Sequence, residues 1–139
     1  MKPLEIAVVL EPRDDATGMV AAILRELTDA LQVYLASGRT HVIDLATLPL
    51  GQADRAALQQ ALGAGEIEVR INALGASLLR ETGFAGIWWI RHEDLAGKLL
   101  CESLEVTDVP EIVRAHRTDI EAASARLRGL TAPPNRGSD

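Results

Sequence analysis

The residues of this sequence that could do chemistry are few. They are three histidines, one cysteine and scattered carboxylates. His92 and Cys101 come closest to a nucleophile and its base, because a reactive thiolate needs a base within hydrogen-bonding reach. A four-residue hairpin loop at 94–97 would make His92 and Cys101 diagonal neighbours on one face of a sheet. Diagonal neighbours are too far apart on average for proton transfer, and no third group is evident to orient the histidine. A buried, structural cysteine is therefore favoured over a catalytic one.

No other pattern predicts a catalytic, cofactor-binding or metal-binding site. The single cysteine excludes an internal disulfide and a Cys-x-x-Cys pair. Gly63-Ala64-Gly65 follows a predicted helix and precedes a predicted strand, the reverse of the order that binds phosphates. We therefore expect a protein that is not an enzyme. A small enzyme that uses His92 and Cys101, or the carboxylates near Glu81, stays as the alternative.

Charge and hydropathy exclude several classes of protein. Twenty acidic and fourteen basic residues in a chain of 139 give a net charge of −6, so the electrostatic pattern of a non-specific nucleic-acid binder is missing. No apolar run approaches the roughly 18 residues that would cross a membrane. Glu5 comes too early for a signal peptide. We expect a cytoplasmic protein without nucleic-acid or membrane partners.

The hydrophobic spacing predicts an α+β domain. Apolar residues recur at helical spacing in three segments: about 16–36, 52–62 and 110–128. Short apolar runs predict strands or extended segments at 4–10 and 41–45. From about 65 to 106 the period changes to alternation, interrupted by glycine-containing turns, which predicts a four-stranded antiparallel meander with the helices packed on one face. We expect one domain over 1–130 and a disordered tail over 131–139.

Aromatic residues are scarce but clustered. Three of the four lie within 84–89. Trp88 and Trp89 are consecutive on a predicted strand, so they point to opposite faces of the sheet. One can enter the core. The other would lie on the far side, as a lone surface aromatic or beneath a partner protein, since tryptophan is enriched at interface hot spots. The candidate interaction residues of this segment are Glu81, Phe84, Trp88, Trp89 and Arg91.

Several stretches of the sequence resemble one family in order and spacing. They are Ile43-Asp44-Leu45-x-x-Leu48-Pro49-Leu50, Gly63-x-Gly65-Glu66-Ile67, Glu81-Thr82-x-Phe84-x-Gly86-Ile87-Trp88, Gly97-Lys98-Leu99-Leu100 and Leu104-Glu105-Val106-Thr107-Asp108-Val109-Pro110-Glu111. Together they resemble the C-terminal conserved region of HupH/HyaF-type hydrogenase expression proteins, over roughly residues 20–128. Trp89 departs from the resemblance, because a polar residue is expected after the tryptophan that matches Trp88.

The resemblance implies an accessory role in the maturation of nickel–iron hydrogenases. Members of the family are thought to act around the iron–sulfur small subunit before export or assembly. The expected partners are therefore a hydrogenase subunit precursor or other maturation proteins, with a chaperone-like function and no cofactor. Longer members have an additional N-terminal half that this sequence lacks, so we also expect a possible homodimer. A homodimeric binding domain with an unrelated partner stays as a further alternative.

Overall fold

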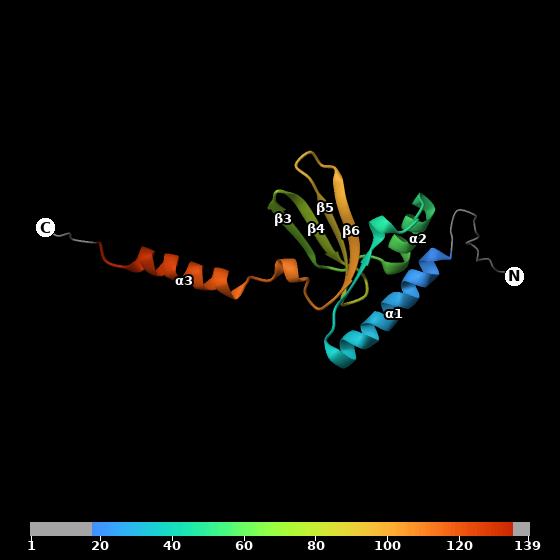
Figure 1. The fold of residues 1–139 in the computed structure, drawn as a ribbon, viewed down its shortest axis with the longest axis horizontal. Helices are drawn as coiled ribbons and strands as arrows, with labels where there is room; N and C mark the ends of the chain where they lie inside the picture. The colour runs from blue at the N-terminus through green and yellow to red at the C-terminus, as the bar shows by residue number, and fades with distance from the viewer. Residues whose placement is uncertain (1–17, 135–139) are drawn as a thin grey trace.

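The computed structural model describes residues 18–134, which form a five-stranded antiparallel sheet and three α-helices (Figure 1). The helices are α1 Met19–Ser37, α2 Gln52–Leu62 and α3 Arg117–Thr131. The strands are β2 His41–Asp44, β3 Glu68–Ala73, β4 Gly75–Glu81, β5 Ile87–Glu93 and β6 Leu99–Val106. Two short 3-10 helices follow strands of the sheet: η2 Leu45–Thr47 after β2 and η3 Glu111–Val113 after β6.

The strands lie in the order β2-β6-β5-β4-β3. The predicted meander corresponds to β3 through β6, but the prediction of a four-stranded sheet is one strand short. β2 joins the sheet beside β6, with Ile43 opposite Leu104. The short apolar run at 41–45 predicted the strand, whereas its partner lies far along the chain and no local pattern identifies it. The strand predicted at 4–10 lies outside the described residues.

Helices α1 and α2 form where they were predicted and pack on one face of the sheet. We call this the helix-side face; it carries Trp89 and Leu104. Helix α1 buries Ile23 and Leu27 at helical spacing. It ends at Gly38, whose positive φ of 76° suits a residue without a side chain and whose amide donates to Tyr34 O at 2.7 Å.

The opposite face, the far face, carries a second and smaller apolar cluster. Trp88, Leu79 and Ile90 are buried there, and Val69 and Ile71 pack half-buried against them. Figure 1 shows that α1 and α2 lie on the other side of the sheet, while the chain leaving β6 passes through η3 on the far-face side. The two sides of the sheet are therefore covered by different kinds of structure.

The prediction of a helix over 110–128 packed on the sheet is wrong in both start and packing. The segment forms η3, then extended backbone at Arg114 and His116, and only then α3. None of the residues of α3 is buried, and the helix points away from the sheet (Figure 1). Helical spacing shows that one side of a segment is apolar, but not what covers that side. Residues 135–139 of the predicted tail lie outside the described residues.

Candidate functional site

The predicted cysteine–histidine arrangement differs from the observed one. His92 lies directly opposite Cys101, because a β-bulge after His92 shifts the register so that Glu93 pairs with Leu99. On the other neighbouring strand, β4, Ser77 lies opposite His92, and its hydroxyl is 2.6 Å from His92 Nδ1. Ser77 is thus a third group in this row, which the sequence did not suggest. Cys101 is exposed rather than buried.

In the part of the chain that the structure describes, we find neither a group of side chains suited to bind a metal ion nor a helix suited to span a membrane. Within residues 18–134, no group of three or more histidine, cysteine, aspartate or glutamate side chains is placed to hold a metal ion. None of the helices over the same range is long and apolar enough to cross a bilayer.

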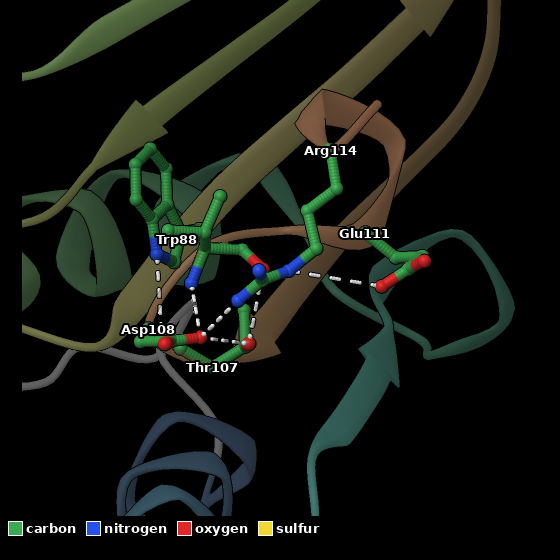
Figure 2. Close-up of polar contacts among 6 residues, drawn as sticks. Trp88, Thr107, Asp108, Glu111 and Arg114 are labelled. Carbon is green, nitrogen blue, oxygen red and sulfur yellow. Dashed lines mark hydrogen bonds and ion pairs between the residues drawn. The ribbon is translucent and has the colours of Figure 1, made fainter. Parts of the chain in front are cut away.

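Trp88 and Trp89 point to opposite faces as predicted, but both are buried. Their exposed fractions are 3% and 7%, so the expectation that one of them would be exposed or covered by a partner is wrong. Trp88 is covered by the segment that follows β6, and its Nε1 donates to Thr107 O at 3.2 Å (Figure 2). The alternation of side chains along a strand could not reveal this covering segment, because its path depends on tertiary contacts.

The segment over Trp88 is held by a small polar cluster. Asp108 Oδ1 accepts the backbone amide of Val109 at 2.7 Å and Arg114 Nη2 at 3.1 Å (Figure 2). The amide hydrogen bond and the charge of Arg114 lower the pKa of the Asp108 carboxyl. The contacts of Asp108 close the turn that leads into η3.

On the helix-side face, Trp89 contacts a buried charge. Its Nε1 donates to Glu102 Oε2 at 2.6 Å, and Glu102 is fully buried. Arg55 of α2 binds the other carboxylate oxygen, and Arg91 Nη1 lies 3.1 Å from Oε2. Burial alone would raise the pKa of Glu102. The hydrogen bonds from Trp89 and Arg55 and the two guanidinium charges together lower it below its usual value.

Glu102 and Arg55 were missed in the sequence, although a signal for Glu102 exists. Glu102 belongs to the same alternating series as Leu104 and Val106, which are both fully buried. A carboxylate in such a series must be paired when it is buried. Trp89, which departs from the expected family pattern, is one of its partners.

The turn between β4 and β5 carries Phe84, the most exposed of the predicted interaction residues, with 52% of its surface accessible. Thr82 Oγ1 accepts the amide of Phe84 at 3.1 Å, and Glu81 Oε2 accepts the amide of Gly86 at 3.3 Å. The amide of Gly83 donates to Leu62 O at 2.8 Å, which fixes the turn to the end of α2. Phe84 is therefore presented on a restrained loop.

Two hollows flank this turn, each of about 240 Å³. The apolar hollow lies between α1, α2 and the turn, and its lining includes Leu24, Leu27, Leu31, Leu62, Phe84 and Ile87. The polar hollow lies on the other side of the α2 terminus, and its lining includes Gln59, Ala64, Arg80, Glu81, Thr82 and Trp89. The turn that carries Phe84 thus lies between an apolar hollow and a hollow lined by polar side chains together with Trp89.

The sequence matches the family model described as the C-terminal conserved region of the HupH hydrogenase expression protein, over residues 19–132. The chain belongs to this family. A solved structure of the hydrogenase expression protein HupH from Thiobacillus denitrificans is similar, with a TM-score of 0.79 and 39% identity over 82% of this chain and 95% of that one. The relationship confirms the resemblance found in the sequence.

Curated relatives carry corresponding names. The hydrogenase expression/formation protein HupQ of Azotobacter chroococcum is 35% identical over 119 residues, which are 86% of this chain and 40% of the relative. The hydrogenase-1 operon protein HyaF of Escherichia coli is 36% identical over 87 residues, which are 63% of this chain and 30% of the relative. The chain therefore spans less than half the length of these relatives.

Proposed function

We propose that this chain is a non-catalytic accessory protein of nickel–iron hydrogenase maturation. It binds a hydrogenase precursor, the iron–sulfur small subunit, in the cytoplasm. The names of its relatives support the hydrogenase context. The observation that carries the binding role is an exposed Phe84 on a restrained turn beside an apolar hollow.

The geometry of the turn favours binding. An exposed aromatic side chain next to a concave apolar surface offers a partner both an anchor and a pocket. The backbone amides of the turn already donate hydrogen bonds to Thr82, Glu81 and Leu62, so little conformational entropy is lost when a partner docks. Trp88 and Trp89 then act as buried supports of β5. We propose Glu81 as a positioning residue, because its carboxylate binds the backbone of the turn.

Co-purification with an affinity-tagged small-subunit precursor tests this proposal. Phe84→Ala in the full chain should reduce the amount of complex at least tenfold, since truncation of an aromatic hot spot costs about 2 kcal/mol or more. Leu74→Ala is the matched control, because Leu74 is 88% exposed on the turn between β3 and β4, away from both hollows.

Both variants should keep the circular dichroism spectrum and urea midpoint of the wild type, as each truncates a side chain more than half exposed. Failure of the wild-type protein to bind the precursor would contradict the proposed partner. Binding by Phe84→Ala at the level of Leu74→Ala would contradict the role of the turn.

A further inference from the structure

The helix-side cluster of buried residues includes none from β3 or β4, and arginines gather on this part of the face. Arg80 lies opposite Trp89, and Leu78 lies between Arg70 and Arg91 in the cross-strand register. Opposite residues of neighbouring strands share a face, so Arg70, Arg80 and Arg91 are on the side of Trp89. Arg55 reaches the same side from α2 through Glu102. We call Arg55, Arg70, Arg80 and Arg91 the arginine face.

Positive charge exceeds negative charge on this face. Arg55 and Arg91 share the single carboxylate of Glu102. Arg70 is paired with Glu68, with 3.1 Å between Nε and Oε2. The arginine face therefore holds four cations against the two carboxylates that they bind, although the whole chain has a net charge of −6.

Arg80 is the member of the face without a partner: among the residues that the structure describes, no hydrogen bond or ion pair of its guanidinium is found. It is exposed, lies opposite Glu68 in the cross-strand register, and lines the polar hollow together with Gln59, Glu81, Thr82 and Trp89. A guanidinium binds a carboxylate through two parallel hydrogen bonds, which makes an unpaired arginine at a concave rim suited to an acidic side chain.

We infer that the arginine face binds an acidic segment of the partner protein, with a carboxylate of that segment on Arg80. This inference rests on the proposed function for the identity of the partner. The polar hollow and the apolar hollow adjoin the same turn, so one partner can contact Phe84 and Arg80 together. A short acidic protein segment is favoured over a nucleic acid, because a net charge of −6 repels a long polyanion more strongly than a segment with a few carboxylates.

Charge reversal tests the inference in the chain described above. Arg80→Glu should weaken binding of the purified small-subunit precursor at least tenfold in 50 mM salt. Arg126→Glu is the matched control, with the same change in net charge on the exposed helix α3, and should change the affinity less than twofold. Raising the salt to about 300 mM should weaken the wild type and Arg126→Glu but change Arg80→Glu little.

A hexaglutamate peptide and a single-stranded oligothymidylate serve as independent probes. Arg80-dependent binding of hexaglutamate, with no binding of the precursor, would support the arginine face and overturn the proposed partner. Equal precursor binding by Arg80→Glu and Arg126→Glu would overturn the arginine face and leave the proposed function standing. Preference of the wild type for the oligonucleotide over hexaglutamate would overturn the acidic protein segment as ligand.

Discussion

Trp88 and Trp89 are neighbours in β5 and almost equally buried, yet the two faces of the sheet hold them differently. On the helix-side face, the indole of Trp89 donates to the ionised carboxylate of Glu102 within a network of two arginines. On the far face, the indole of Trp88 donates to a neutral backbone carbonyl, that of Thr107. The two indoles are almost equally buried, but the hydrogen bond of Trp89 should stabilise the fold more than that of Trp88, because hydrogen bonds to charged groups are stronger.

Two glutamates of β6 show the same contrast between the faces. The pKa of Glu102 on the helix-side face is lowered, because its donors outweigh the effect of burial. Burial raises the pKa of Glu105, which lies opposite Trp88 on the far face, and the negative charge of Glu111 raises it further. A carboxylate is thus stabilised on one face and disfavoured on the other.

Among substitutions that compare the two faces, removal of Glu102 should lower the free energy of unfolding the most. Glu102→Ala leaves two arginines without their carboxylate and the indole N–H of Trp89 without an acceptor. We expect it to lower the free energy of unfolding by about 3 kcal/mol, in the range for breaking a buried ion pair. Urea denaturation measures this loss. A loss no larger than that of an exposed control, Glu121→Ala on α3, would contradict the role of the network.

The pH dependence of stability gives the same network a separate test. Because the folded pKa of Glu102 is lowered, its contribution is present above the unfolded pKa and disappears as the pH falls through the lower folded value. The wild type should therefore lose stability on acidification across this range. Glu102→Gln, which cannot ionise, should show a flatter profile in the same denaturation series.

Replacement of each tryptophan by phenylalanine should have intermediate effects of unequal size. Trp89→Phe removes a hydrogen bond to a charged acceptor and should lower the free energy of unfolding by about 2 kcal/mol. Trp88→Phe removes a hydrogen bond to a neutral carbonyl and should cost about 1 kcal/mol. Urea midpoints of the two variants measured side by side test the order. The reverse order would show that the polar partners do not distinguish the two faces.

Glu105→Gln should have the smallest effect, and in the opposite direction to changes at Glu102. The raised pKa of Glu105 means that ionisation of this side chain costs folding stability at neutral pH. A neutral side chain of the same shape relieves that cost, so the urea midpoint should rise slightly at pH 7. The gain should vanish on acidification, when Glu105 itself becomes protonated. A lower midpoint at pH 7 would contradict the unfavourable setting inferred for this carboxylate.

Local patterns were enough to predict α1, α2 and the strands β3 to β6, because the two helices bury residues at helical spacing, β3 and β6 alternate in burial, and glycine-containing turns separate the strands. Contacts between distant segments were not predictable in this way. The pairing of β2 with β6, the cover over Trp88 and the solvent-exposed position of α3 all depend on where remote segments meet. The bulge after His92 likewise changed a register that loop length alone had suggested.

The candidate site likewise contains residues that local sequence could predict and residues that depend on contacts between distant segments. Phe84 and its turn were identified from composition and glycine spacing, which are local. Arg80 and the partners of Glu102 were not, since α2 and three strands must come together before the excess of arginine exists. The alternation that places Glu102 with Leu104 was the one sequence signal pointing to this network.

The position of β2 affects the order in which a newly made chain can fold. His41 pairs with Val106, so β2 leaves the ribosome well before the strand that completes its hydrogen bonds. Until β6 emerges, α1, β2 and α2 lack the sheet surface on which Ile43 and Leu45 are finally buried. The strands β3 to β6 can pair one hairpin at a time, whereas the apolar residues of α1, β2 and α2 stay exposed to solvent until β6 is available. The earliest part of the described chain to be synthesised is therefore among the last to be protected from aggregation.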